Sequence, residues 1–390
     1  MASLAPARGA RARVLFALIG FLTLADLFAT QAILPALAAR YSVGAGTIGV
    51  AANAGTIGMA IAGLLAGVLA SEVDRRRGIW AALALLALPT LLLAIAPNLW
   101  TFALLRVAQG LCMATAFTLT ITYVAEHFTP EEATAALAAY VTGVVASNLV
   151  GRLITATVAS TAGLPSSFTL FALLNLGGAL VTRFALASGA PMMQPRCDHF
   201  WSAWAAHLQT PALRRAFAVG FLILFGFIGV FTYVGFVLAA PPFALSMRAL
   251  GLVFLCFAPS LVTTPLAGQA ARRLGTPRAL PLSLALAIAG LALAALPSLA
   301  ALILGLALVA IGTFFAQALA TASVGRIATR DKAAASGLYL CCYYLGGLIG
   351  AVAVGALFDA GGWHAALAAV ALALGLAAWL GAGLKPATDG

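Results

Sequence analysis

Long apolar stretches, separated by short polar or turn-forming breaks, repeat along the whole chain. Each stretch has about 20 residues or more, the length that an α-helix needs to cross the hydrocarbon core of a bilayer. We therefore predict an all-α membrane protein with twelve transmembrane helices. These helices are expected at residues 14–37, 47–70, 78–97, 100–125, 134–160, 165–187, 214–240, 249–271, 279–297, 299–325, 333–358 and 363–383.

The breaks between the runs carry charged or turn-forming residues, such as Thr129-Pro130-Glu131-Glu132 and Gly361-Gly362. Most connections are short, but a polar, proline-containing stretch at 188–213 follows the sixth run. This stretch divides the chain into a six-helix bundle at 1–187, a cytoplasmic linker at 188–213 and a second six-helix bundle at 214–390.

Composition supports the membrane assignment and excludes several other classes of protein. Hydrophobic residues make up 63% of the 390 residues, charged residues only 8%, and the mean hydropathy is +1.08. Because an ordinary soluble domain is about 25% charged, this chain has too few charges to cover a water-exposed surface. A soluble enzyme, a secreted disulfide scaffold and a disordered chain are thereby excluded. The cysteines show no Cys-x-x-Cys spacing and no Gly-x-x-x-x-Gly-Lys nucleotide loop occurs, so we expect no metal, no other cofactor and no ATP-driven step.

The net charge of +11 suggests nucleic-acid binding until the basic residues are placed on the predicted topology. With the N-terminus inside, only Arg40 and Arg248 fall outside, and only Arg106 and Arg152 fall within spans. The asymmetry indicates orientation by the positive-inside rule, with both termini cytoplasmic and no nucleic-acid partner. The cytoplasmic segments hold Arg8, Arg11, Arg13, Arg75, Arg76, Arg77, Arg183, Arg196, Arg214, Arg215, Arg272, Arg273, Arg278, Arg326, Arg330, Lys332 and Lys385.

Two similar segments, one in each predicted half, suggest an internal repeat of the kind found in secondary transporters. Gly67-Val68-Leu69-Ala70-Ser71-Glu72-Val73-Asp74-Arg75-Arg76-Arg77 follows the second span, and Gly268-Gln269-Ala270-Ala271-Arg272-Arg273 follows the eighth. The first segment resembles the major facilitator superfamily (MFS) loop pattern Gly-x-Leu-Ala-Asp-Arg-x-Gly-Arg-Arg, although Ser71 replaces its Asp. The resemblance implies two pseudo-symmetric six-helix halves, with Glu72 or Asp74 in the gating role of the missing Asp.

Further motifs narrow the resemblance within this superfamily. Leu104-Leu105-Arg106-Val107-Ala108-Gln109-Gly110 is similar to the fourth-span motif whose Arg is associated with proton coupling. Asp26 followed by Leu34-Pro35 resembles the first span of drug:proton antiporters. The strings Phe231-Thr232-Tyr233-Val234-Gly235-Phe236 and Ala335-Ser336-Gly337-Leu338-Tyr339 resemble a bacterial arabinose-efflux-permease-like branch. The resemblance implies a multi-pass protein of the bacterial inner membrane.

Ionisable side chains deep in spans are costly, so each is a functional hypothesis. Asp26, Arg106 and Arg152 are the three such residues, and all lie in the first half. We predict that Asp26, with Arg106, is the proton-coupling site, because desolvation favours its neutral acid while a nearby arginine favours the carboxylate. The alternative is a static Asp26–Arg106 or Asp26–Arg152 pair that only holds helices together.

The fifth span carries a polar helical face formed by Asn148, Arg152 and Thr155. An adjacent stripe of Gly143, Ser147 and Gly151 suits close helix contact in lipid. We expect the polar face to line the central cavity. Two arginines against one aspartate leave this cavity positive, which favours anionic or zwitterionic substrates.

The remaining site predictions concern the cavity wall and the surfaces that slide during transport. The wall candidates are polar or aromatic residues in spans, which suit the orientation of a small ligand: Gln31, Asn53, Tyr233, Gln317, Tyr339 and Tyr343. In the major facilitator superfamily, which this sequence resembles, the second and eleventh spans face each other across the two halves. Small residues at this interface would let the halves slide past each other. Our gating candidates are Gly67, Glu72, Asp74, Arg75, Arg76, Gly346 and Gly350.

We therefore predict a proton-coupled secondary transporter, not an enzyme, that exports a small organic molecule by rocker-switch alternating access. Its partners are the substrate, protons and the lipid bilayer, and we expect a monomer. A proton-driven importer of a small metabolite remains the first alternative, because sequence does not set direction. A non-transporting membrane scaffold or sensor is a further alternative.

Overall fold

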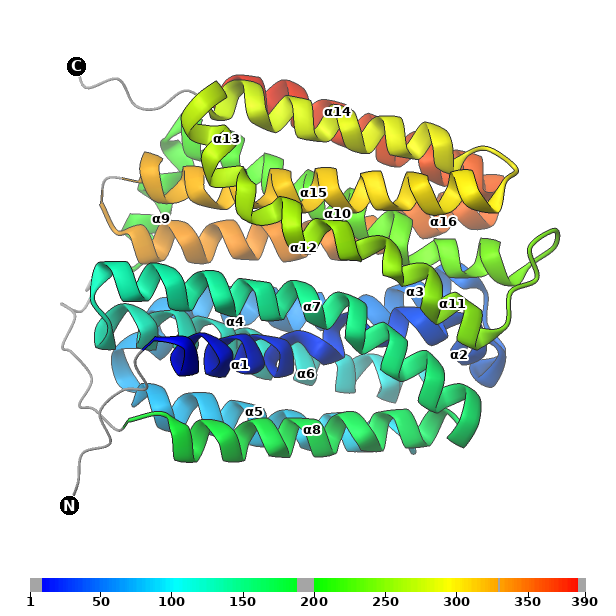
Figure 1. Ribbon diagram of the computed structural model, residues 1–390, viewed down its shortest axis with the longest axis horizontal. Helices are drawn as coiled ribbons and strands as arrows, with labels where there is room; N and C mark the ends of the chain where they lie inside the picture. Colours follow the sequence, from blue (N-terminus) through cyan, green and yellow to red (C-terminus); the bar gives the residue numbers. More distant parts are fainter. Residues whose placement is uncertain (1–8, 188–199, 329, 385–390) are drawn as a thin grey trace.

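The computed structural model describes residues 9–187, 200–328 and 330–384, with only the backbone given for 66–72, 130, 131, 200–203 and 333. The N-terminal half is helical throughout and begins with a first span broken by a short 3₁₀ turn (Figure 1). Its elements are α1 (Ala10–Ala29), η1 (Thr30–Ile33), α2 (Leu34–Tyr41), α3 (Ala45–Asn53), α4 (Gly55–Glu72), α5 (Arg75–Leu93), α6 (Leu99–His127), α7 (Pro130–Ala162) and α8 (Leu164–Ala185).

The C-terminal half follows with the same succession of long helices, and its second span is also broken by 3₁₀ turns. Its elements are α10 (Pro211–Ala239), α11 (Met247–Val253), η2 (Phe254–Phe257), α12 (Ala258–Thr263), η3 (Thr264–Leu266), α13 (Ala267–Leu274), α14 (Thr276–Ala294), α15 (Leu299–Ile327) and α16 (Lys332–Ala382).

Eleven helices of the described residues are long and apolar enough to span a membrane, and the last of these contains two spans. α16 is interrupted at Gly362, whose φ of 68° and ψ of −163° are non-helical. This left-handed φ favours glycine, which has no Cβ to clash, so the Gly361-Gly362 break lies where the sequence predicts it. The twelve-helix, all-α membrane fold is therefore confirmed.

Residues 188–213, predicted as a polar linker, contain a further helix, α9 (Phe200–Gln209). It contacts α10 and α16, and His207 Nε2 lies 3.2 Å from the main-chain oxygen of Asp331. The linker prediction did not include this helix.

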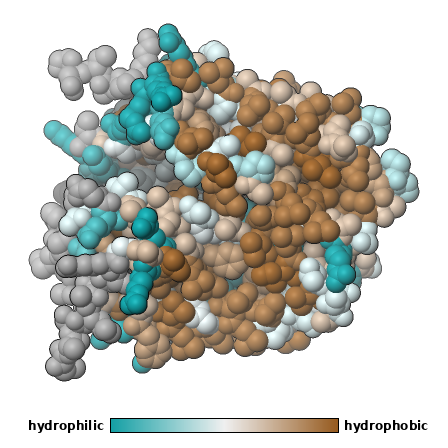
Figure 2. Space-filling model, viewed as in Figure 1, coloured by the Kyte–Doolittle hydropathy of each residue, from teal (hydrophilic) through white to brown (hydrophobic). Residues whose placement is uncertain are grey.

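The helices lie roughly parallel, so the molecule has two ends. We call the end that holds the start of α1, the start of α5 and α9 the terminal side, and the end that holds Gly44, Asn98 and Gly163 the distal side (Figure 1, left and right). Figure 2 shows a broad hydrophobic face between them, with hydrophilic residues gathered mainly toward the terminal side. Large apolar side chains such as Leu104, Trp100 and Leu372 are exposed on the surface. A belt of this kind suits contact with lipid.

Equivalent spans make equivalent contacts in the two halves. The first and fifth spans pair as α1 with α7, and the seventh and eleventh pair as α10 with α16. The second and fourth pair as α4 with α6, and the eighth and tenth pair as α12 and α13 with α15. The halves meet where α10 touches η1 and α2, where α3 and α4 touch α16, and where α7 touches α11 and η2.

Candidate functional site

Asp26 lies in the last turn of α1 and is buried, with 4% of its surface exposed. Its carboxylate accepts hydrogen bonds from Thr90 Oγ1 at 3.2 Å, Gln109 Nε2 at 3.2 Å and Asn175 Nδ2 at 2.9 Å. These donors come from α5, α6 and α8, so four helices of the N-terminal half meet at this carboxylate. Three neutral donors thus hold a group that the bilayer core would otherwise exclude.

Arg106 of α6 binds the same region through main-chain oxygens. Its Nη1 donates to the Asp26 carbonyl at 2.9 Å, its Nη2 to Leu27 at 2.8 Å and its Nε to Ala52 at 2.7 Å. These carbonyls lie in the last turns of α1 and α3, where a helix leaves acceptors without intrahelical partners. Among the described residues, neither arginine forms an ion pair with the Asp26 carboxylate. The static pair considered from sequence is thus not formed.

A small pocket with a cavity volume of about 10 Å³ lies beside this group, inside the N-terminal half. Polar side chains from α1, η1, α6, α7 and α8 line it together with two aromatic rings. The lining residues are Asp26, Ala29, Thr30, Arg106, Gln109, Thr155, Ser167, Phe168 and Phe171. The Asp26 side chain therefore borders a polar space about large enough for one water molecule.

Arg152 of α7 lies at the contact between the halves and is fully buried. Its Nη2 donates to Gln31 Oε1, and its Nη1 donates to the main-chain oxygen of Asn148 at 3.2 Å. Its Nε and the Asn148 Oδ1 have no hydrogen-bond partner in the described part of the chain. The packing predicted for the stripe beside it is confirmed, because Gly143 and Gly151 face the α1 backbone.

Gln31 connects Arg152 to a polar cluster that spans both halves. Gln31 Nε2 lies 3.5 Å from Asn53 Oδ1 and 3.4 Å from Thr232 Oγ1, and Asn53 Nδ2 donates to Thr232 Oγ1 at 3.0 Å. Asn53 ends α3, and Thr232 belongs to α10 of the other half. The structure therefore brings together four cavity candidates: Gln31, Asn53, Asn148 and Arg152.

Tyr233 follows Thr232 but has a different environment. Its hydroxyl donates to the Ala351 main-chain oxygen, and its ring fills a slot between Gly49 of α3 and Gly355 of α16. A Cβ at Gly49 would lie 2.5 Å from the Tyr233 hydroxyl oxygen, so glycine is needed for this approach. Tyr233 thus joins the halves by close contact.

The tyrosines of α16 form a second group nearer the terminal side. Tyr339 and Tyr343 stack with ring centroids 6.1 Å apart, and Thr321 Oγ1 donates to the Tyr339 hydroxyl at 3.3 Å. Tyr339 lies beside Gly220, twelve residues before Thr232 on α10 and therefore about 18 Å from it along the helix. The half-buried Gln317 lies on α15. The structure does not bring these tyrosines to Arg152.

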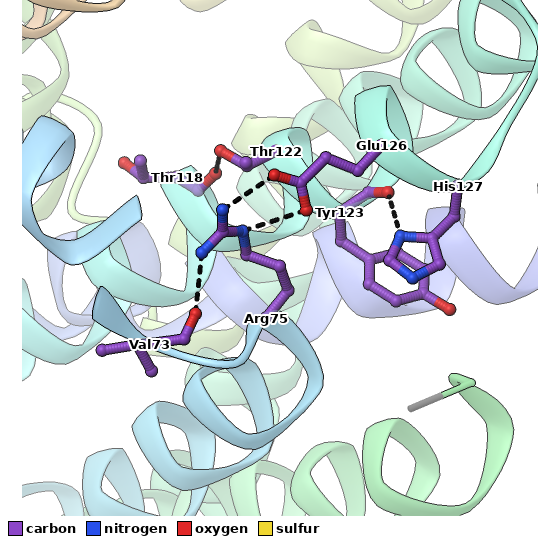
Figure 3. Close-up of polar contacts among 7 residues, drawn as sticks. All are labelled: Val73, Arg75, Thr118, Thr122, Tyr123, Glu126 and His127. Atoms are coloured by element: carbon purple, nitrogen blue, oxygen red, sulfur yellow. Dashed lines mark hydrogen bonds and ion pairs between the residues drawn. The ribbon is translucent and has the colours of Figure 1, made fainter. Parts of the chain in front are cut away.

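The loop between α4 and α5 holds a buried ion pair on the terminal side (Figure 3). Arg75 Nη2 lies 2.7 Å from Glu126 Oε1 of α6, and Arg75 Nη1 donates to Val73 at 2.7 Å. Asp74 caps α5 by accepting from the Arg77 amide at 2.8 Å, and Arg76 donates to the Arg183 carbonyl. At Gly67 and Glu72 only the backbone belongs to the described structure.

The gating glycines of the eleventh span face a different neighbour from the one expected. Gly346 and Gly350 face the backbone of Phe221 and Phe225 on α10, within the same half. Their expected contact with the second span is wrong. The second and eleventh spans meet instead at Gly63 and Gly337, where a Cβ on Gly337 would lie 2.7 Å from the Gly63 oxygen.

Sequence reasoning missed several polar residues of these networks. Thr90 and Gln109 carry no charge and so gave little signal, although Gln109 stands in the fourth-span motif. Glu126 lies just beyond the predicted end of its span. Asp359, near the end of the eleventh span, accepts from the Gly46 amide with both carboxylate oxygens at 3.2 Å and joins the halves on the distal side. Within the described part no His, Cys, Asp and Glu cluster could hold a metal.

Comparison with known proteins agrees with this architecture. The family model described as Major Facilitator Superfamily matches residues 16–251 and 236–389, so each half is matched. The chain is 29% identical over 374 residues to the inner membrane transport protein YnfM of Escherichia coli, covering 93% of this chain and 87% of that protein. It is 26% identical over 367 residues to the uncharacterized MFS-type transporter YybF of Bacillus subtilis, covering 93% and 90%.

A solved structure shares the fold. The bacterial homologue of the human lysosomal transporter Spinster, in an inward-facing and occupied conformation, superimposes with a TM-score of 0.73 at 15% identity. The match covers 96% of this chain and 94% of that one. Family match, relatives and fold agree with the architecture of two six-helix halves, and the chain belongs to the Major Facilitator Superfamily of membrane transporters.

Proposed function

We propose that this protein is a proton-coupled secondary active transporter that exports a small organic molecule across the bacterial inner membrane. The observation that carries the proposal is the Asp26 carboxylate, buried among Thr90, Gln109 and Asn175 beside the pocket in the N-terminal half. A carboxylate held by neutral donors is able to exchange a proton without separating from a tightly bound cation. Arg106, bonded to the Asp26 main chain, keeps a positive charge close to the exchanging group.

The orientation in the membrane follows from the basic residues. Arg75, Arg76 and Arg77 start α5, and Arg272 and Arg273 end α13, all on the terminal side. Arg40 and Arg248 belong to α2 and α11, near the distal side. By the positive-inside rule the terminal side is cytoplasmic, and with it both chain ends.

Alternating access would require the halves to separate first on one side and then on the other. On the distal side, Asp359 and the Tyr233 slot join them. Closer to the terminal side, Gly63 and Gly337 touch. We assign gating to these contacts and to the loop ordered by Arg75, Asp74 and Arg76. The substrate site is the Arg152–Gln31–Asn53 cluster between the halves, whose buried guanidinium favours an anionic or zwitterionic compound.

The test uses purified protein in liposomes with an acidic lumen and a panel of radiolabelled organic acids and amino acids. Export coupled to proton antiport predicts that a panel compound accumulates while the lumen becomes more alkaline. Asp26→Asn should abolish this proton-driven accumulation but retain exchange of labelled for unlabelled compound without a pH gradient, which shows that the variant is folded. Proton-driven accumulation that survives in Asp26→Asn would refute the proton role. Compound and proton moving in the same direction would show import instead.

A further inference from the structure

Arg152 is a buried cation that has no anionic partner among the described residues. No part of the residue is exposed, and its hydrogen bonds go to a neutral amide and a main-chain oxygen. Its Nε has no partner, and no ion pair to it occurs within the described residues. Burying an unpaired charge costs several kcal/mol, so an arginine held in this way is expected to have a counter-charge at some stage of the protein's work.

Phenylalanine rings enclose the guanidinium. The Arg152 Cζ lies 4.5 Å from the ring centroid of Phe254, 4.6 Å from Phe257, 5.2 Å from Phe28 and 5.8 Å from Phe231. These distances allow attraction between the cation and each ring face, which offsets part of the cost of burial. We call Arg152 and these four rings the Arg152 cage. It places a single charge beside four aromatic rings.

The cage is assembled from both halves. Phe28 and Arg152 belong to α1 and α7, whereas Phe231 belongs to α10 and Phe254 and Phe257 to η2. Rocking of the halves would therefore part Phe231, Phe254 and Phe257 from the guanidinium and open the cage to solvent. A ligand bound there would contact both halves at once, as coupling of binding to alternating access requires.

The chemistry of the cage limits what fits. A planar guanidinium binds a carboxylate through two parallel hydrogen bonds, and the free Nε is one of the donors needed. The rings suit an apolar body of similar size. One turn away, the unpaired Asn148 Oδ1 accepts one neutral donor, such as a hydroxyl. A substrate ammonium finds no carboxylate among the partners of Arg152, Gln31 or Asn148, and a neutral oxygen does not offset its burial.

Resting on the proposed transport function, we infer that the Arg152 cage binds an organic monocarboxylate with an apolar, ring-sized body, in preference to zwitterions and cations. The substrate class would then be apolar organic acids, narrower than the anionic or zwitterionic class above. Arg152 would supply the counter-charge and the phenylalanine rings would set the size of the body.

Four probes that vary the ring, the carboxylate and the ammonium test this selection on the purified full-length protein. Mandelate carries a ring, a carboxylate and a hydroxyl; phenylglycine replaces that hydroxyl with an ammonium; phenethylamine has a ring and an ammonium only; glycolate lacks the ring. Affinity is measured by thermal shift and by calorimetry at neutral pH. We expect mandelate to bind at least tenfold more tightly than each of the other three.

Two variants test whether mandelate binds at the Arg152 cage. Arg152→Gln removes the charge, and the nearly isosteric Gln31→Glu places a carboxylate against the guanidinium. Each should weaken mandelate binding at least tenfold, and the second guards against misfolding of the first. Arg40→Gln, an exposed arginine on the distal side, serves as the matched control and should bind mandelate as the wild type does.

Several outcomes would overturn the inference: no mandelate binding at millimolar concentration, phenylglycine binding as tightly as mandelate, or folded Arg152→Gln and Gln31→Glu that bind like the wild type. Failure of the proposed transport function can be distinguished from failure of the cage inference. A wild-type protein that transports another compound with protons but ignores mandelate contradicts only the cage. Mandelate binding without any proton-coupled transport contradicts only the proposed function.

Discussion

Arg106 and Arg152 are both buried deep in spans of the N-terminal half, and the protein satisfies them in different ways. Arg106 donates four hydrogen bonds, three to main-chain oxygens at helix ends and one to Gln109. Arg152 donates two, leaves its Nε unpaired and lies among aromatic rings. Both have 1% or less of their surface exposed, so burial alone does not separate them.

The difference follows from backbone geometry. Arg106 lies opposite the last turns of α1 and α3, where carbonyl groups lack intrahelical donors and a cation is favoured by the helix dipole. Arg152 lies in the middle of the long helix α7, opposite side chains of the other half. Hydrogen bonds therefore hold Arg106 within the N-terminal half. Arg152 keeps an unused hydrogen-bond donor, its Nε, at the surface where the halves meet.

The largest expected effect is on stability in Arg106→Leu. The change leaves the carbonyls of Asp26, Leu27 and Ala52 without this donor, at about 1–3 kcal/mol for each unpaired buried group. We expect a loss on the order of 3 kcal/mol or more, seen as a large fall in the unfolding temperature in detergent. Arg106→Leu as stable as the wild type would remove the contrast between the two arginines.

Asn175→Leu tests whether neutral donors hold the Asp26 carboxylate. The variant loses the 2.9 Å hydrogen bond to Oδ2, and a hydrogen bond to a charged group contributes about 1.5–3 kcal/mol. Because the ionised form loses more from the missing bond than the neutral acid does, the pH of half-maximal proton-driven transport should rise by about one to two units. The measurement is the transport rate as a function of pH in liposomes. An unmoved or lowered midpoint would mean that Asn175 does not support the carboxylate.

Arg152→Leu should have little effect on stability, in contrast to Arg106→Leu. Removing an unpaired buried charge recovers its desolvation cost, and the variant loses only two hydrogen bonds and the attraction of the rings. We expect a change in the free energy of unfolding within about 1 kcal/mol, of either sign, together with loss of mandelate binding. A destabilisation as large as that of Arg106→Leu would make Arg152 a structural residue.

Much of the fold was predictable because a bilayer imposes the length and apolar character of each span. Gly362 ends the eleventh span where the Gly361-Gly362 pair predicts it. The break after Asn53 and the 3₁₀ turns at Thr30 and Phe254 were not predictable. They lie inside apolar runs without a charged residue. Pro35, Pro259 and Gly55 stand beside them, but such residues are tolerated within spans, so contacts with neighbouring helices decide whether a break forms.

The charged residues of the candidate site were predictable from the sequence, but their hydrogen-bond partners were less so. Asp26, Arg106 and Arg152 stand out because charge is costly in spans. Their contacts depend on which atoms meet: Arg106 binds the main chain of Asp26, and the carboxylate binds neutral side chains. Phenylalanines such as Phe254 and Phe257 are ordinary in an apolar run, so the Arg152 cage has no signature in sequence.

The smallest effect on stability is expected for Arg40→Gln. This variant distinguishes the contribution of hydrogen bonds to helix-end carbonyls from the contribution of burial. Arg40, like Arg106, donates to main-chain oxygens at a helix end, those of Ala94 and Ala96 at 3.3 and 3.4 Å, but it is exposed. Water replaces those bonds when the side chain is shortened, so the free energy of unfolding should change by no more than about 0.5 kcal/mol. Unfolding in detergent provides the measurement, beside Arg106→Leu. If Arg40→Gln were as damaging as Arg106→Leu, capping of carbonyls rather than their burial would explain the importance of Arg106.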